Sequence, residues 1–212
     1  MVGDLDRRPT VGVRSKTTGM NIVVTSLKGG VGKSTTSIYL AAAAVERGYD
    51  PVTLVDADPQ ASAAEWLETW PVEGIAVVEA PSERTAVRAM SRVEGVGIVD
   101  TPPGSERLTQ SAVGAADVVV IPTRAGGVEY SRVTATLALV PASTPRGLVI
   151  CAARRGTNDL EAAIDWWKGQ RVEIWGVVPE RVGIATGPEA RLSREGLTEY
   201  DVVLRRALRG WR

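Results

Sequence analysis

Short apolar runs alternate with longer stretches of helical periodicity from Met20 onward. Several runs are apolar and β-branched throughout, which is typical of strands covered by helices on both faces. The predicted strands are Asn21–Ser26, Val52–Asp56, Ile75–Glu79, Val96–Asp100, Val118–Ile121, Leu148–Cys151 and Ile174–Val178. The predicted helices between them are Lys33–Arg47, Ala61–Thr69, Glu83–Val93, Glu106–Ala115, Tyr130–Val140 and Leu160–Lys168. This alternation predicts an α/β domain with a doubly wound, mostly parallel sheet and ligands at the carboxyl ends of its strands.

The first 19 residues are polar and lack this periodicity, so we expect a disordered extension before a single domain over residues 20–212. A basic arm that contacts DNA is the alternative interpretation of this extension. That arm would use Arg7, Arg8, Arg14 and Lys16.

The last segment, Leu197–Arg212, also has helical periodicity, with apolar side chains on one face and arginines on another. The apolar face comprises Leu197, Tyr200, Leu204, Leu208 and Trp211, and the basic face comprises Arg205, Arg209 and Arg212. Three interpretations are open: a helix docked on the sheet with a solvated basic edge, a patch for DNA phosphates, and a helix lying on an anionic membrane. The membrane is least favoured, because a helix that must be freed for lipid cannot also belong to the core.

The amino-acid composition excludes several classes of functional site. The 25 basic and 25 acidic residues give a formal net charge of zero, so nucleic-acid binding would need a local patch. The single cysteine, Cys151, excludes an internal disulfide and a multi-cysteine metal or iron–sulfur site within one chain. The absence of histidine excludes histidine triads and histidine-ligated zinc. No stretch approaches the roughly 20 apolar residues of a membrane span, so the expected compartment is the cytoplasm.

The stretch GGVGKST follows a predicted strand and opens a predicted helix. Its glycines let the backbone curl so that N–H groups converge on phosphate oxygens, and the helix N-terminus adds its partial positive charge. Lys33 can then reach the β- and γ-phosphates, and the Ser34 hydroxyl can bind Mg²⁺. The predicted phosphate-binding residues are Gly29, Gly30, Val31, Gly32, Lys33, Ser34 and Thr35.

A further lysine, Lys28, precedes these glycines. With it, KGGVGKST resembles the deviant Walker A motif of the ParA/MinD family of ATPases. The resemblance implies that the nucleotide is ATP, that the chain forms a homodimer on binding it, and that Lys28 reaches the phosphates held by the other subunit. Such a cation delivered in trans would stabilise the spread charge of phosphoryl transfer and tie dimerisation to nucleotide state. A solvated lysine beside the loop is the alternative.

Two acidic segments each end a predicted strand: DADPQ, residues 56–60, and VDTPPG, residues 99–104. They resemble the family's DxDPQ motif and its Walker B element. The resemblance implies that Asp58 positions or activates the attacking water, that Asp56 supports the metal region, and that Asp100 holds Mg²⁺ through water. Asp58 could instead be the N-cap of the following helix, and residues 101–104 could form a structural turn.

Adenine contacts come from late loops in this family, which here implies Arg154, Pro179 and Arg181. The likeness spans residues 20–182 and is nearest to the small ParA-like partition ATPases. Two positions depart from the commoner pattern. Ser34 replaces threonine but keeps the hydroxyl, whereas Leu27 before Lys28 has no interpretation.

Three functions fit these patterns. The favoured one is a DNA-partition ATPase whose ATP-bound dimer binds DNA non-specifically on the nucleoid and is stimulated by a small centromere-binding, ParB-like adaptor. The second is a MinD-like positioning ATPase that cycles on a membrane, and the third is a metabolic ligase or reductase of the same superfamily. The reductase branch needs cluster cysteines, and this chain has one cysteine.

Overall fold

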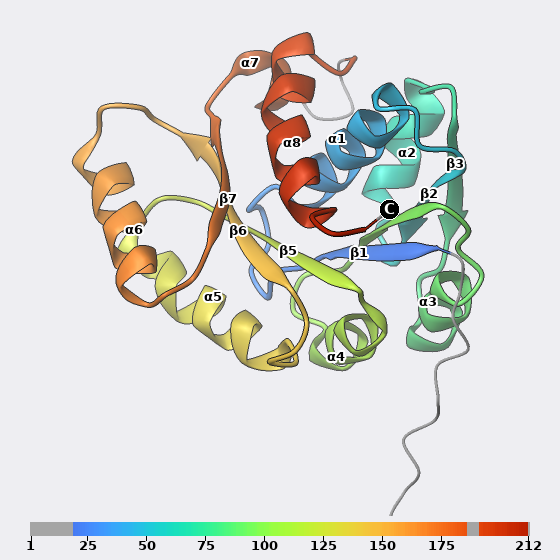
Figure 1. The fold of residues 1–212 in the computed structure, drawn as a ribbon, viewed down its shortest axis with the longest axis horizontal. Helices are drawn as coiled ribbons and strands as arrows, with labels where there is room; N and C mark the ends of the chain where they lie inside the picture. The colour runs from blue at the N-terminus through green and yellow to red at the C-terminus, as the bar shows by residue number, and fades with distance from the viewer. Residues whose placement is uncertain (1–18, 186–190, 212) are drawn as a thin grey trace, which may run out of the picture.

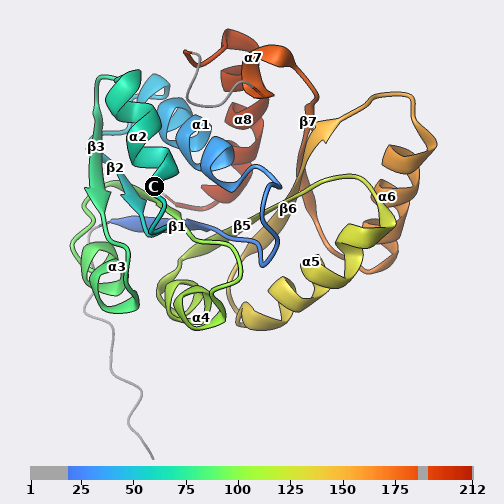
Figure 2. The same ribbon diagram turned by 180° about the vertical axis from the view of Figure 1, so that it is seen from behind.

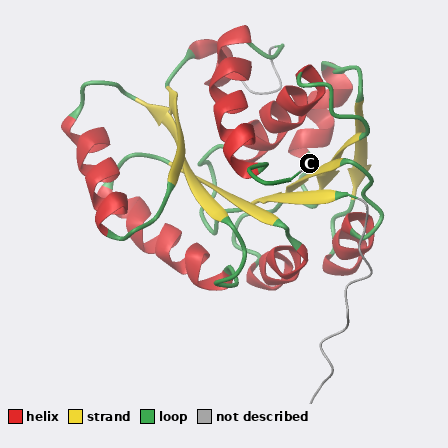
Figure 3. Cartoon of the chain, viewed as in Figure 1, coloured by secondary structure: helices red, strands yellow, loops and turns green. Residues whose placement is uncertain are grey.

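The computed structural model describes residues 19–185 and 191–211. A seven-stranded sheet in the order β3-β2-β4-β1-β5-β6-β7 crosses the molecule, and its neighbouring strands are parallel (Figures 1 and 3). The strands are β1 Met20–Val24, β2 Val52–Asp56, β3 Ile75–Glu79, β4 Val96–Asp100, β5 Val118–Thr123, β6 Arg146–Ala153 and β7 Ile174–Pro179. The helices are α1 Lys33–Glu46, α2 Ser62–Thr69, α3 Glu83–Met90, α4 Glu106–Ala115, α5 Gly127–Leu139, α6 Asn158–Gly169, α7 Val182–Ala185 and α8 Arg194–Ala207. The predicted parallel α/β sheet is confirmed.

Helices cover both faces of the sheet, with α1, α2 and α8 on one side and α3, α4 and α5 on the other (Figure 2). The strand residues alternate between the two cores, as the period of two requires. In β1, Ile22 and Val24 pack with α1 and α8, whereas Val23 packs with α4 and α5. The central strand is thereby buried on both faces. Its carboxyl end leads directly into the loop before α1.

Several predicted boundaries were wrong, most of them by a turn or less. Helix α5 begins at Gly127 rather than Tyr130, and α6 begins at Asn158 behind the N-cap Thr157. Helix α8 begins at Arg194 because Ser193 is its N-cap and accepts the Gly196 N–H at 3.1 Å. It ends at Ala207, well before Arg212. Single side chains cap the starts of α6 and α8, whereas α5 begins after Gly126 without a side-chain cap, and hydrophobic periodicity registers neither kind of boundary.

The C-terminal helix is docked in the core. Tyr200 stacks on Tyr39 of α1 with ring centroids 5.1 Å apart, and Val203 and Leu204 are fully buried. Gly196 lies so close to Tyr39 that a Cβ atom there would stand 2.4 Å from its ring. The basic edge is partly engaged, because Arg205 pairs with Asp201. Of the three interpretations of this segment, the structure bears out the docked helix.

The N-terminal segment with its candidate basic arm lies outside the described residues, as does Arg212. Within the residues that the structure describes, no helix combines the length and the apolar character needed to cross a bilayer.

Candidate functional site

The loop between β1 and α1 has the geometry of an anion cradle. Gly30 and Gly32 adopt positive φ angles of 71° and 95°, which other residues rarely adopt. Gly32 is the N-cap of α1 and provides no side-chain cap, so the first N–H groups of the helix are left for another acceptor. An anion at this helix N-terminus would therefore meet free donors and the positive end of the helix dipole.

A cavity of about 490 Å³ opens beside this loop, within the usual size range of small-ligand sites. Its walls come from the phosphate loop, the ends of β2 and β4, and the loops after β5, β6 and β7. The lining residues are Gly30, Val31, Gly32, Lys33, Ser34, Thr35, Asp58, Gln60, Ser62, Pro103, Arg124, Cys151, Ala152, Val178, Pro179, Glu180, Arg181, Ile184 and Tyr200. Most of the predicted phosphate-loop residues therefore face one cavity, as does Asp58.

Lys33 lies at the floor of the site and is 7% exposed. Its Nζ donates to the backbone carbonyl of Lys28 at 3.2 Å. Burial lowers the pKa of Lys33, while the negative charges of Asp100 and Asp58 oppose that shift. The ammonium group of Lys33 therefore lies near the loop backbone and near two carboxylates from different parts of the sheet. Asp100 ends β4, and Asp58 follows β2.

Asp100 is fully buried at the end of β4, next in register to Val24 of β1. Its Oδ1 accepts the Ser37 hydroxyl at 3.0 Å, but Oδ2 has no partner among the described residues. Burial raises the pKa of Asp100 to about 7, and the charge of Asp56 adds to that shift. The two serine hydroxyls and Lys33 oppose it.

These donors fit a magnesium ion that takes most of its ligands from water and from phosphate oxygens. Ser34 and the open oxygen of Asp100 are hard oxygen donors at the mouth of the phosphate loop. Within the described residues, no group of three or more acidic, cysteine or histidine side chains could hold a metal unaided. Any Mg²⁺ here would therefore depend on phosphate oxygens and water.

The two acids of the DADPQ segment lie in different environments. Asp56 is 1% exposed and accepts the N–H groups of Asp58, Ala63 and Ala64 at 2.9 to 3.0 Å. Among the described residues, the carboxylate of Asp58 accepts only the Gln60 N–H, at 2.9 Å, and Asp58 lines the cavity. Burial raises the pKa of Asp56, an effect that those backbone N–H groups reduce.

The capping role suggested for Asp58 therefore belongs to Asp56. The residue at the N-cap of α2 is Ala61, which has a φ of 51° and no side-chain oxygen. The carboxylate of Asp56 reaches across from β2 and satisfies the first N–H groups of the helix instead. Because both of its oxygens already accept backbone hydrogens, the metal-supporting role of Asp56 would act through position and charge.

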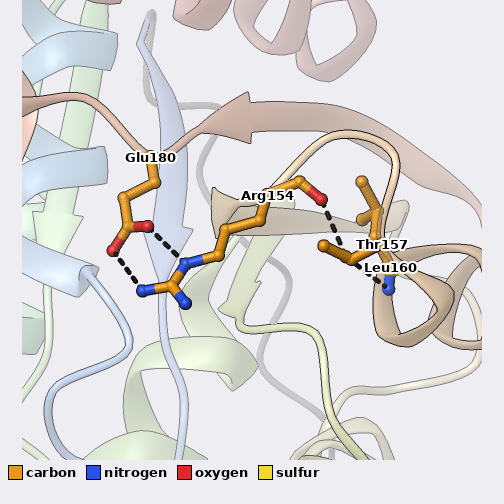
Figure 4. Close-up of polar contacts among 4 residues, drawn as sticks. All are labelled: Arg154, Thr157, Leu160 and Glu180. Atoms are coloured by element: carbon orange, nitrogen blue, oxygen red, sulfur yellow. Dashed lines mark hydrogen bonds and ion pairs between the residues drawn. The ribbon is translucent and has the colours of Figure 1, made fainter.

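The three predicted adenine-contact residues separate in the structure. Pro179 and Arg181 line the cavity, whereas Arg154 lines an adjoining hollow of about 280 Å³. The exposed guanidinium of Arg154 donates to both carboxylate oxygens of Glu180, at 2.6 and 3.5 Å (Figure 4). Its backbone carbonyl accepts the hydroxyl of Thr157, the N-cap of α6. The pairing with Arg154 lowers the pKa of Glu180, which itself lines the main cavity.

Comparison with known proteins identifies the family. Residues 22–193 match the family described as the CobQ/CobB/MinD/ParA nucleotide binding domain. The chain belongs to this family. Like the geometry of the loop, this membership indicates nucleotide binding. The sequence resemblance to ParA and MinD is confirmed.

Individual members of the family cover most of the chain. It is 35% identical over 193 residues to the maintenance of carboxysome distribution protein A of Gloeobacter kilaueensis, covering 87% of this chain and 76% of that one. It is 32% identical to the chromosome-partitioning ATPase Soj of Thermus thermophilus, covering 79% and 84%. The crystal structure of a plasmid partition protein from Borrelia burgdorferi, bound to AMPPNP, superposes with a TM-score of 0.72 at 18% identity, covering 91% and 99%. That structure bears on the fold alone.

Lys28 precedes the glycines of the phosphate loop and forms an ion pair with Glu129 in the first turn of α5. Sequence analysis missed Glu129 and also Ser37, the hydroxyl donor to Asp100. A signal for Ser37 exists, because it stands one helical turn after Lys33 and so shares its face. The signal for Glu129 is weaker: an acid that follows two glycines after a strand, in a sheet whose order the sequence does not state.

Proposed function

We propose that this protein is an ATPase of the partition type, whose ATP-bound homodimer binds DNA non-specifically and hydrolyses ATP when an adaptor protein stimulates it. The observation that carries the proposal is the convergence of Lys33, Asp58 and Asp100 beneath a glycine loop that also contains Lys28. The two relatives described above, one named for carboxysome distribution and one for chromosome partitioning, support it. The cargo-specific partner would be a small ParB-like, centromere-binding protein.

Each residue has a proposed task. Gly29 to Thr35 bind the phosphates, with Lys33 supplying the charge that neutralises the β- and γ-phosphates. Ser34 and Asp100 hold Mg²⁺, directly or through water, and the ion supplies charge neutralisation at the phosphates when bound. Asp58 faces the cavity and would orient the attacking water. Pro179 and Arg181 would contact the base, and Arg154 would act at the edge of that subsite.

Lys28 would complete the site of the other subunit. The side chain of Lys28 is 35% exposed, so it could reach the phosphates bound by a facing subunit. A cation supplied in trans stabilises developing charge only when the two subunits meet, so turnover would depend on dimerisation. This arrangement suits a switch better than an enzyme that serves metabolism.

DNA binding in three nucleotide states tests the function. Protein with ADP, ATP or a slowly hydrolysed analogue is mixed with non-specific duplex DNA, and retention is measured at increasing salt. We expect binding with ATP and the analogue, weak binding with ADP, and a steep loss of affinity with salt because phosphate contacts release counterions. Binding independent of nucleotide, or insensitive to salt, would contradict the proposal.

Co-sedimentation with anionic vesicles distinguishes the membrane-cycling alternative. The apolar face of α8 packs against α1 and β7, so that face is not offered to lipid. We expect ATP-bound protein to stay in the supernatant with vesicles and to co-sediment with DNA. The reverse pattern would favour the MinD-like function.

A further inference from the structure

Helix α5 holds the segment before the phosphate loop from two points on one face. The Leu27 N–H donates to Thr136 Oγ1 at 3.2 Å, and Lys28 Nζ is paired with Glu129. Glu129 and Thr136 are seven residues apart, two helical turns, so both side chains face the loop. Leu27, which has no interpretation in the sequence, is therefore part of an anchored loop. The position of Lys28 depends on a helix that lies outside the nucleotide motifs.

Glu129 is placed to hold a cation. It is 7% exposed, its Oε2 has no hydrogen-bond partner, and among the described residues Lys28 is the only cation that pairs with it. It lies in the first turn of α5, where the helix dipole stabilises an anion. The helix starts after Gly126, whose φ is 142°, and Gly127 follows it. Such a pair of glycines at an element boundary can serve as a hinge.

A third contact joins Lys28 to Lys33, the lysine of the predicted phosphate site. The ammonium group of Lys33 donates to the backbone carbonyl of Lys28 at 3.2 Å. A bound triphosphate would compete for that ammonium, because Lys33 lies on the floor of the phosphate site. Nucleotide binding would thus loosen one of the contacts that fix Lys28, while the contacts to α5 remain.

We propose that Glu129 is a positioning residue that keeps Lys28 bound within its own subunit and thereby limits turnover until a second subunit competes for the lysine. This inference rests on the proposed trans role of Lys28. One ammonium group cannot fully satisfy a buried carboxylate in its own chain and phosphates across an interface. The strength of the Lys28–Glu129 pair therefore sets how readily the ATP-bound dimer becomes active.

Lysine acylation tests the contact itself, without any reference to ATP hydrolysis. The chain has only Lys16, Lys28, Lys33 and Lys168, so mass spectrometry can follow each after brief treatment with an acetylating ester. In nucleotide-free protein we expect Lys28 of Glu129→Gln to react about 3- to 10-fold faster than Lys28 of the wild type. Exposed Lys168 is the internal reference and should not change. Equal rates at Lys28 would overturn the proposal.

Two further variants make this measurement specific. Glu161→Gln removes another first-turn glutamate, on α6, which is exposed and pairs with no cation among the described residues, so it should leave the reactivity of Lys28 unchanged. Glu129→Asp keeps the charge and should restore most of the protection. Should Glu129→Gln be poorly folded, the buried Lys33 would also react faster, and Glu129→Asp compared with the wild type would then decide.

Adaptor-free ATP turnover tests the consequence. We expect Glu129→Gln to raise basal turnover about 3- to 10-fold and to form dimers at lower protein concentration, with ATP affinity per subunit unchanged. The gain should vanish in the Lys28→Ala background. A fall in turnover towards the level of Lys28→Ala would overturn the proposal, since Glu129 would then assist the reacting dimer. A wild type that binds ATP without dimerising or hydrolysing it would overturn the proposed function, and the acylation result would still decide the contact.

Discussion

The carboxylate of Asp56 accepts the backbone N–H of Asp58 at 3.0 Å, so the first acid of the DADPQ segment fixes the second. The other oxygen of Asp56 accepts two N–H groups at the start of α2. Asp58 is left facing the cavity. Two carboxylates of the same motif therefore have separable consequences: Asp56 supports the local structure, and Asp58 is available to a ligand or a water.

Replacing Asp56 by alanine should destabilise the fold. Three backbone N–H groups would lose their acceptor, and α2 would lose its only side-chain cap. Relief of the buried charge offsets part of this loss, so we expect the free energy of unfolding to fall by about 2 kcal/mol. Urea denaturation of the nucleotide-free protein measures it. Asp56→Asn, which keeps one acceptor oxygen, should lose less, and a fully stable Asp56→Ala would contradict the capping role.

Asp58→Ala should leave the fold nearly as stable as the wild type, within about 1 kcal/mol, because the Asp58 carboxylate accepts a single hydrogen bond from the described residues. Its proposed role is in hydrolysis, so turnover should fall at least about 100-fold while ATP still binds. The variant should accumulate as an ATP-bound dimer, which light scattering detects as a doubled mass. A monomer in saturating ATP would argue against this role.

The two lysines of the loop should fail in different ways. Lys33→Ala removes the buried cation of the phosphate site, and ATP affinity should fall at least about 10-fold, the equivalent of a charged hydrogen bond. Lys28→Ala should bind ATP normally and hydrolyse it at least about 100-fold more slowly. Equilibrium binding of a fluorescent ATP analogue and phosphate release separate the two effects. If Lys28→Ala hydrolysed ATP at the wild-type rate, the proposed role of Lys28 in the site of the other subunit would be wrong.

The sequence was sufficient for the parts of the site whose geometry is local. The loop from Gly29 to Ser34 is defined by its glycines and by the strand and helix that flank it, and residues 30–34 line the cavity between β1 and α1. The end of β4 at Asp100 was also predicted. In each case a short run of residues determines backbone, burial and position together.

Contacts between segments that lie far apart in the chain could not be predicted from the sequence. Glu129 meets Lys28 across 101 residues because β5 pairs with β1, and strand order is not written in hydrophobic periodicity. The exchange of roles between Asp56 and Asp58 has a different cause. Spacing alone shows two acids near a helix start, but only the turn at Ala61 decides which carboxylate reaches the N–H groups.

Asp100→Asn should stabilise the protein without nucleotide and abolish its response to magnesium. The wild-type carboxylate is fully buried, with one oxygen that has no partner among the described residues, so its charge is costly at pH 8. We expect the free energy of unfolding of the variant to rise by about 1 kcal/mol. Thermal unfolding with ATP, with and without Mg²⁺, should show a magnesium-dependent stabilisation only in the wild type. A magnesium response in Asp100→Asn would place the ion elsewhere.

Gly196→Ala tests whether α8 is held in the core. The new Cβ would stand 2.4 Å from the ring of Tyr39, so helix or ring must shift, and we expect the free energy of unfolding to fall by about 1 to 3 kcal/mol. Gly114→Ala is the matched control: it lies in α4 with nothing within 4 Å of the new atom and should raise stability by about 0.5 to 1 kcal/mol. Urea denaturation of both variants measures the difference. Because loosening α8 would also free its apolar face, a Gly196→Ala protein that gained ATP-dependent binding to anionic vesicles would revive the membrane-cycling alternative.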